Sequence, residues 1–424
     1  MSESTGLTGL IVALINRRRI SNTLRRIENE NIVEQGVVKY QPSSIEAFFD
    51  ETEAMGSMVF SGGLNPIRCR AISRAIECAY LQGYSVVAVH ADNQELENTL
   101  LNSFGNQYVS IVNKGNPVYD PFYGKSNSDI NRLVLSSGTK GIEVGSSGLY
   151  YLEGISDFIR SKGIVPYIDM YITCPHMELF DKINDLELKG VIDSEKARQI
   201  TSKLMQGEIE RSNIENFFSR LSTQSNGIIA KKPQLKYAVN VEKAFRGKQI
   251  ISIDVCSSTN TILLNIVINE IVMEMEKGKR VLLIADNIPL QTSNALQQLV
   301  KSLGANCSVI LSADDVYSLF GGEENEFFAF AGKCSKTILS KHSSAFSSQK
   351  LSEFIGYYDK KEITGTFSEN ANYVGQWGMG ASSTASVTVK REPIIKPEEL
   401  NRMSADEVFI QNKHTGEISF TTIV

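Results

Sequence analysis

Residues 58–96 read MVFSGGLNPIRCRAISRAIECAYLQGYSVVAVHADNQEL, and this stretch decides the fold. A short apolar run, Met58 to Phe60, meets a turn that contains Gly62 and Gly63. Apolar residues at helical spacing follow, and Ser85 to Val89 then form a valine-rich run that is typical of a buried parallel strand. The order of strand, glycine turn, helix and strand predicts a βαβ unit, on which phosphate-binding loops lie.

The turn almost has the spacing of a phosphate-binding loop, G-x-x-x-x-G-K-S/T. Gly62 takes the first glycine position, but Ile67, Arg68 and Cys69 replace the second glycine, the lysine and the hydroxyl residue. A β-branched residue hinders close approach of the backbone to phosphate, and the proline in this loop has no N–H. Cysteine is a poor ligand for magnesium, which prefers oxygen. The stretch is therefore either a degenerate nucleotide site, formed by Gly62, Gly63, Arg68 and Cys69, or an ordinary strand-to-helix turn.

Composition places the chain among soluble globular proteins. Its 424 residues suffice for two or three domains, and 42% of them are apolar and 21% charged. The net charge of −5 provides no overall basic field for nucleic acid or an anionic membrane. The six cysteines have no C-x-x-C spacing and no signal peptide is evident, which indicates a reducing cytosol. Cys174 and His176 are the one close Cys/His pair, so we expect no metal.

The N-terminal region carries an apolar run from Gly6 to Ile15, which is too short to span a bilayer. Arginines 17–19, 25 and 26 follow it. An interfacial membrane helix with a basic flank is one interpretation; we favour a helix packed on its own protein or on a neighbouring subunit. DNA binding at this basic cluster is an unsupported alternative, because no aromatic residues interleave with the arginines.

The pattern of strands and helices is interrupted once along the chain. Residues 128–235 predict an all-helical insertion, in which one helix ends at Gly190 and Asp193 caps the next. From Lys248 to Leu311 strands and helices alternate, which predicts a parallel sheet covered on both faces. We expect the following residues to lie on adjacent parallel strands: Val59, Val87, Ile253, Leu283 and Ile310.

The most hydrophobic strand, Val281 to Ala285, ends in Asp286 and Asn287. In nucleotide-hydrolysing enzymes an acidic pair at this place orients magnesium and polarises the attacking water. Asp286 retains the first group, whereas the amide of Asn287 cannot accept the proton of the water. The alternative is that Asp286 only caps the helix that follows the strand.

From about residue 50 to 424 the order of segments resembles the soluble ATPase part of type IV secretion coupling proteins, the TraG/TraD family. The segment at 91–96, ADNQEL, keeps only the last two residues of the family's D-P-K-G-E-L-like motif, and Leu311 stands at its sensor glutamine. The fullest match is REPIIKPEEL at 391–400, which resembles R-P-L-(L/I)-x-P-x-E-(I/L) and follows a serine-rich linker, Ser382 to Ser386.

The resemblance implies an α/β protein with a RecA-like P-loop NTPase fold, in which a parallel sheet core carries an inserted all-alpha subdomain. We expect an N-terminal helical segment at 1–48, a nucleotide-binding-type domain at 49–127 and 236–424, and the all-alpha insertion at 128–235. Members of the family are hexameric motors that recruit DNA or protein substrates to a secretion channel.

The leading hypothesis is a pseudo-ATPase with no catalytic residue and no cofactor, because almost every nucleotide-handling position has changed. It would act as a scaffold or adaptor among the protein subunits of a type IV secretion, conjugation or related translocation assembly, in a homo-hexamer or hetero-oligomer. We expect a cytoplasmic location, with the inner face of the cell membrane reached only through partners or the N-terminal segment.

Two alternatives remain. One is a divergent, active ATP-dependent translocase of DNA or protein, in which Arg68 and Asp286 hold ATP and magnesium weakly and a neighbouring subunit supplies the base. The other is a phage-defence or regulatory protein that only binds nucleotide.

Overall fold

The computed structural model describes residues 54–225, 227–255, 261–304, 306–369 and 381–423, together with residues 18, 21, 22, 25, 38–40 and 49. The apolar run from Gly6 to Ile15, and most of the N-terminal segment at 1–48, lie outside the described residues. Within the described part of the chain, no helix is long and apolar enough to cross a membrane.

The core is a ten-stranded sheet in the order β1-β12-β11-β8-β2-β7-β6-β3-β5-β4. The strands from β8 to β4 are parallel to one another, and β11 lies antiparallel to both β8 and β12. The strand bounds are β1 Val38–Tyr40, β2 Met58–Ser61, β3 Ser85–His90, β4 Val109–Val112, β5 Ile250–Asp254, β6 Val281–Asp286, β7 Cys307–Ala313, β8 Lys336–Leu339, β11 Glu407–Asn412 and β12 Ile418–Thr422.

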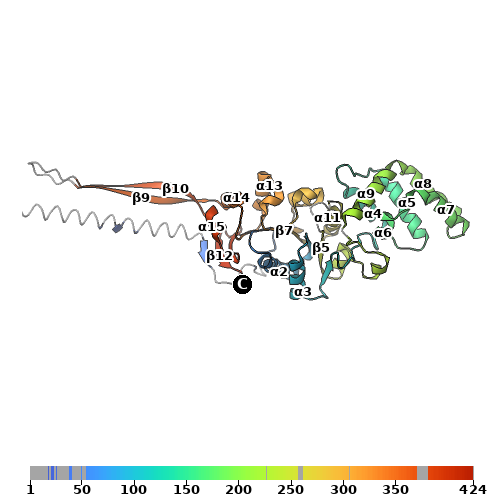
Figure 1. Ribbon diagram of the computed structural model, residues 1–424, viewed down its shortest axis with the longest axis horizontal. Coiled ribbons are helices and arrows are strands. Elements are labelled where there is room, and N and C mark those ends of the chain that lie inside the picture. Colours follow the sequence, from blue (N-terminus) through green and yellow to red (C-terminus); the bar gives the residue numbers. More distant parts are fainter. Residues whose placement is uncertain are drawn as a thin grey trace, which may run out of the picture.

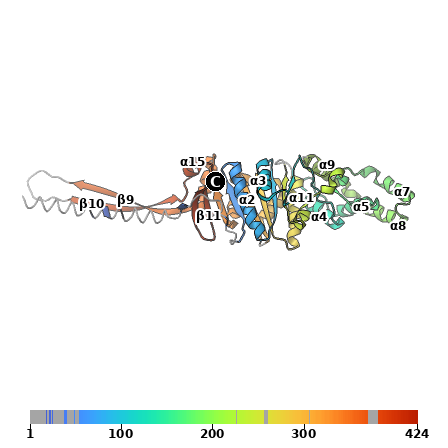
Figure 2. The same cartoon turned by 90° about the horizontal axis from the view of Figure 1, so that it is seen from below.

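The five residues predicted to share adjacent parallel strands do so, on β2, β7, β6, β3 and β5, and β6 lies inside the sheet. Because both faces of these strands are covered, each strand is buried along its whole length, apart from the half-buried first residue of β3. Helices α2 and α3 cover one face and α11 to α14 the other (Figures 1 and 2). The predicted α/β class with a parallel sheet core is confirmed. These helices span α2 Asn65–Leu81, α3 Gln94–Phe104, α11 Thr261–Glu276, α12 Asn294–Lys301, α13 Glu324–Lys333 and α14 Ala345–Ile355.

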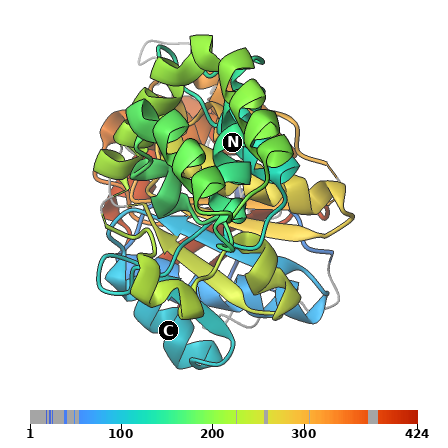
Figure 3. The ribbon, with the colours of Figure 1, turned by 90° about the vertical axis from the view of Figure 1, so that its right-hand side faces the viewer.

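Between β4 and β5 the chain forms a group of helices that extends from one end of the sheet (Figures 1 and 3). The side chain of Asp193 caps α8, as its position predicts, by accepting a hydrogen bond from the N–H of Lys196 at 2.7 Å. The helices are α4 Asn127–Ser136, α5 Gly148–Ser161, α6 Ile168–Ile172, α7 Leu179–Leu188, α8 Ser194–Gln206, α9 Arg211–Gln224 and α10 Val241–Arg246. Short 3-10 helices lie at η2 His176–Glu178, η3 Glu208–Glu210, η4 Lys232–Tyr237, η5 Leu290–Thr292 and η6 Tyr317–Phe320.

A long antiparallel hairpin, β9 (Tyr357–Glu369) with β10 (Ala381–Pro393), projects from the opposite end of the molecule (Figure 1). The interpretation of Ser382 to Ser386 as a linker is wrong. This segment lies within β10 and pairs with residues 364–368 of β9. A strand ladder is formed by backbone groups, so a serine-rich segment without an apolar run still pairs. After the hairpin, α15 (Pro397–Arg402) leads back to β11.

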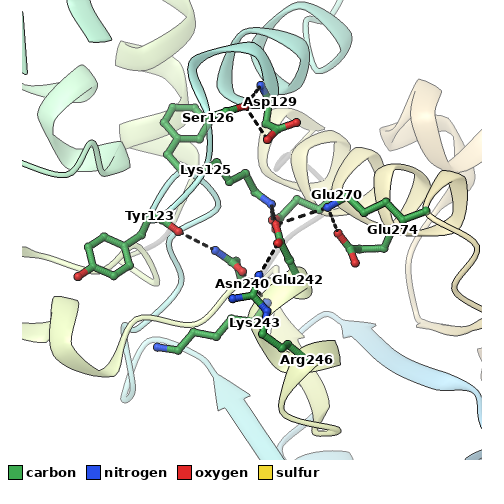
Figure 4. A network of polar contacts seen from close by, with 12 residues as sticks. Tyr123, Lys125, Ser126, Asp129, Asn240, Glu242, Lys243, Arg246, Glu270 and Glu274 are labelled. Carbon is green, nitrogen blue, oxygen red and sulfur yellow. Dashed lines mark hydrogen bonds and ion pairs between the residues drawn. The ribbon is translucent and has the colours of Figure 1, made fainter. Parts of the chain in front are cut away.

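A buried ion-pair network anchors the helical insertion to the core (Figure 4). Lys125, just before α4, places Nζ 3.1 Å from Oε1 of Glu270 on α11 and 3.2 Å from Oε2 of Glu242 on α10. The hydroxyl of Tyr119 donates to the second oxygen of Glu270 at 2.7 Å. Burial raises the pKa of Glu270, and the charge of Lys125 opposes that rise. Lys125 is thus the cation beside the buried Glu270, whereas the half-buried Glu242 also pairs with Arg246 and Lys277.

The variant Lys125→Met leaves the carboxylate of Glu270, 1% exposed, without its cation. We expect the free energy of unfolding to fall by about 3–5 kcal/mol, as measured by urea denaturation followed by circular dichroism. The matched control is Arg132→Met, which removes a pair with Glu276, also on α11, whose side chains are 48% and 52% exposed. It should cost no more than about 1 kcal/mol; equal losses in the two variants would contradict the anchoring role.

Candidate functional site

The carboxyl edge of the parallel sheet carries a row of buried polar side chains. Ser312, Asp286, His90 and Asp254 are direct neighbours on β7, β6, β3 and β5. On each of these strands, a residue two or four positions earlier belongs to the apolar cluster that packs under α2 and α3. Because side chains alternate between the two faces of a sheet, all four polar side chains point to the face that α2 and α3 cover. We call these four residues the polar row; none is more than 8% exposed.

Asn93, the N-cap of α3, joins the polar row to the starts of both covering helices. Its Oδ1 accepts from the N–H of Leu96 at 3.0 Å and from Nδ2 of Asn65 at 2.8 Å. Its Nδ2 donates to Oδ2 of Asp286 at 2.6 Å, while Oδ1 of Asp286 has no hydrogen-bond partner within the described part of the chain. The interpretation of Asp286 as a cap of the next helix is wrong, because Ser293 caps α12.

The glycine turn after β2 is bonded to neighbouring strand ends. Gly62 and Gly63 have φ angles of +91° and +74°, in the left-handed region that glycine tolerates. The N–H of Gly62 donates to the carbonyl of Ala313 at 3.0 Å, and that of Gly63 to the carbonyl of Lys341 at 2.9 Å. In a phosphate-binding loop such N–H groups bind the anion. Here they are already satisfied by the ends of β7 and β8.

The side chain of Arg68 folds back onto this turn. Its NH1 donates to the carbonyl oxygens of Gly63 at 3.0 Å and Gly62 at 3.5 Å, and it pairs with Asp314. The side chain of Arg68 is 1% exposed. The turn therefore directs two carbonyl oxygens at a cation instead of N–H groups at an anion. These residues do not fit a bound nucleotide phosphate.

The two remaining predicted site residues also differ from nucleotide-binding groups. Burial, with the charge of Asp286, raises the pKa of Cys69 to about 12, so its thiol stays protonated and provides no hard oxygen ligand for magnesium. Asn287 has φ +54°, and its N–H donates to the carbonyl of Ser312 at 2.8 Å. Asparagine is among the few residues that tolerate this conformation, which accounts for its presence without a catalytic role.

Sequence reasoning missed the histidines at this edge. Nε2 of His90 lies 3.0 Å from Oγ of Ser252, and burial lowers the pKa of His90, although Asp254 opposes this. On the opposite face of the sheet, Nδ1 of His342 donates to the carbonyl of Ser340, so Nε2 accepts from the hydroxyl of Ser61 at 2.8 Å. The available signal was that β3, β5, β6 and β7 each carry a polar residue at or near the carboxyl end.

The variant Arg68→Ala removes the donor from two carbonyl oxygens of the glycine turn. We expect the free energy of unfolding to fall by about 1–3 kcal/mol in urea denaturation, the usual cost of unsatisfied buried acceptors. Asp314→Ala removes only the ion pair, and the side chain of Asp314 is 80% exposed, so its loss should stay below about 1 kcal/mol. A larger loss in Asp314→Ala than in Arg68→Ala would show that the ion pair, not the turn, holds Arg68.

The variant Asn287→Glu restores the acidic residue that a hydrolytic site needs, but forces it into the left-handed conformation. We expect a loss of about 1–2 kcal/mol in unfolding free energy. Asn287→Gly, which accepts the same φ freely, should be near neutral in the same denaturation experiment. A stable glutamate variant beside a destabilised glycine variant would contradict the backbone explanation of Asn287.

No family model matches the sequence, and no curated protein matches it at the sequence level. Solved structures of similar fold include the bacterial conjugative coupling protein TrwBdeltaN70, with a TM-score of 0.44 and 12% identity over 87% of this chain and 84% of that one. The plasmid coupling protein TrwB in complex with ADP and Mg2+ has a TM-score of 0.46 and 12% identity over 87% and 84%. VirB4 of Thermoanaerobacter pseudethanolicus has a TM-score of 0.46 and 8% identity over 88% and 92%.

Proposed function

We propose that this chain is a pseudo-ATPase: a protein with the fold of a nucleotide-driven motor that acts as a scaffold or adaptor subunit. The observation that carries the proposal is the reversed polarity of the glycine turn. The N–H groups of Gly62 and Gly63 are bonded to Ala313 and Lys341, and their carbonyl oxygens face the guanidinium of Arg68. An anionic ligand would meet acceptors where it needs donors.

A second, independent feature supports the same conclusion. Hydrolysis of ATP requires a residue that orients or deprotonates water. Asn287 has no basic group, and Asp286 is 0% exposed and bonded to Asn93. The alternative of an active translocase would need both a rebuilt turn and a base from a neighbouring subunit. The alternative of a regulatory nucleotide binder would need the rebuilt turn alone.

The kind of assembly is inferred from the sequence resemblance to type IV secretion coupling proteins. We propose protein partners within a secretion, conjugation or related translocation complex, either as a homo-hexamer or in a hetero-oligomer at the cytoplasmic side. Mass measurement of the purified chain, alone and with co-purified partners, distinguishes these two arrangements.

The direct test is steady-state phosphate release by the purified protein with magnesium ATP. We expect turnover far below about one per second, the low end for phosphoryl-transfer enzymes, and no loss in Asp286→Ala. Arg68→Lys, which restores the lysine of the phosphate loop, should not produce activity, because the N–H groups of the turn stay bonded to Ala313 and Lys341.

The competing functions give other results in the same experiment. Turnover of about one per second or more that Asp286→Ala abolishes would promote the active translocase. Tight magnesium-dependent binding of ATP by calorimetry, without turnover, would instead favour the regulatory nucleotide binder.

A further inference from the structure

Three ligand-type side chains gather at the carboxyl ends of β3 and β5. They are His90 on β3, Glu97 on α3 and Asp254 on β5, and one donor atom of each lies within 4.8 Å of the other two. Nε2 of His90 is 3.6 Å from Oε1 of Glu97, and Nδ1 is 3.9 Å from Oδ1 of Asp254. The three residues are 0%, 5% and 8% exposed.

Glu97 points an unsatisfied oxygen into this cluster. Its Oε1 is buried and has no hydrogen-bond partner among the residues that the structure describes, while its Oε2 accepts from Nδ2 of Asn113 at 2.7 Å. Asp254 is likewise oriented, because its Oδ1 accepts from the backbone N–H of Asp92 at 2.9 Å. Hydrogen bonds from neighbouring groups to ligand side chains hold metal ligands in place. A buried carboxylate oxygen with no donor is costly, and a bound cation would satisfy it.

The cluster lies at the carboxyl ends of adjacent parallel strands, a place where ligands bind in α/β proteins. β3 continues into α3 on one face of the sheet, whereas its neighbour β5 leads to α11 on the other face. Strands whose connections leave to opposite faces open a crevice at their carboxyl ends. His90 and Asp254 are direct neighbours across that point.

We propose that His90, Glu97 and Asp254 bind one divalent transition-metal ion such as zinc. An imidazole nitrogen with two carboxylates suits zinc or manganese, whereas magnesium rarely takes nitrogen ligands. Three protein ligands leave the fourth position of a tetrahedral zinc site for another ligand. The expectation of no metal rested on spacing along the chain, and these three ligands come from separate segments. The site is separate from the proposed loss of ATPase function.

The test is a zinc titration of the full, chelator-treated chain against a chromophoric chelator. We expect one ion per chain and a rise in the thermal unfolding midpoint on binding. Glu97→Gln should weaken zinc binding more than about 100-fold. This exceeds the loss seen when a residue that only hydrogen-bonds to a metal ligand is replaced. Glu95→Gln is the matched control, because it makes the same charge change on an exposed residue of the same helix and should leave the affinity unchanged.

Two results would overturn the metal site: no zinc bound by the wild-type chain, or equal affinity in the wild type and Glu97→Gln. Magnesium binding as tightly as zinc would exclude the imidazole as a ligand and also overturn it. If Glu97→Gln does not fold by circular dichroism, Asp254→Asn takes its place. Cobalt titration of the wild type is independent of any variant: one equivalent should give visible d–d absorption that excess zinc removes, and its absence would count against the site.

Discussion

The guanidinium of Arg68 inside the glycine turn is the interaction on which the functional edge depends. It occupies the carbonyl oxygens of Gly62 and Gly63, while the N–H groups of these residues tie the turn to Ala313 and Lys341. Each of these bonds is ordinary, but together they satisfy both sides of the turn from within the protein. Since buried backbone groups must be paired, a turn satisfied in this way has no need of an external ligand.

The buried carboxylates of the polar row, at the same edge of the sheet, also need hydrogen-bond donors. Buried carboxylates are tolerated where donors reach them. Asn93 meets part of this need, because one amide caps α3 and also donates to Asp286. One oxygen of Asp286 and one of Glu97 have no donor among the described residues. At the turn the N–H and carbonyl groups of Gly62 and Gly63 are bonded within the protein, whereas beside His90 an oxygen of Glu97 remains that a cation would satisfy.

Local patterns predicted the strands and helices well, because an apolar run such as Val281 to Ala285 carries its own signal. The carboxyl-edge geometry was harder, since His90 and Asp254 are distant in sequence and meet only through the order of the strands. The direction of the Arg68 side chain follows from the carbonyl oxygens of Gly62 and Gly63, which no sequence pattern places against it. The β9–β10 hairpin escaped prediction because its serine-rich strand lacks the apolar alternation by which a half-buried strand is recognised.

The energetics of the turn favour a scaffold over a weak motor. A phosphate that enters must break the two N–H bonds of Gly62 and Gly63 and the two bonds from Arg68 to their carbonyls. At about 1 kcal/mol each, this costs about 4 kcal/mol, or roughly a thousandfold in affinity. The two N–H bonds also join the turn after β2 to the last residue of β7 and to Lys341, just beyond β8. A turn bonded in this way within the protein supports the proposed role of a subunit that positions partners rather than one that drives them.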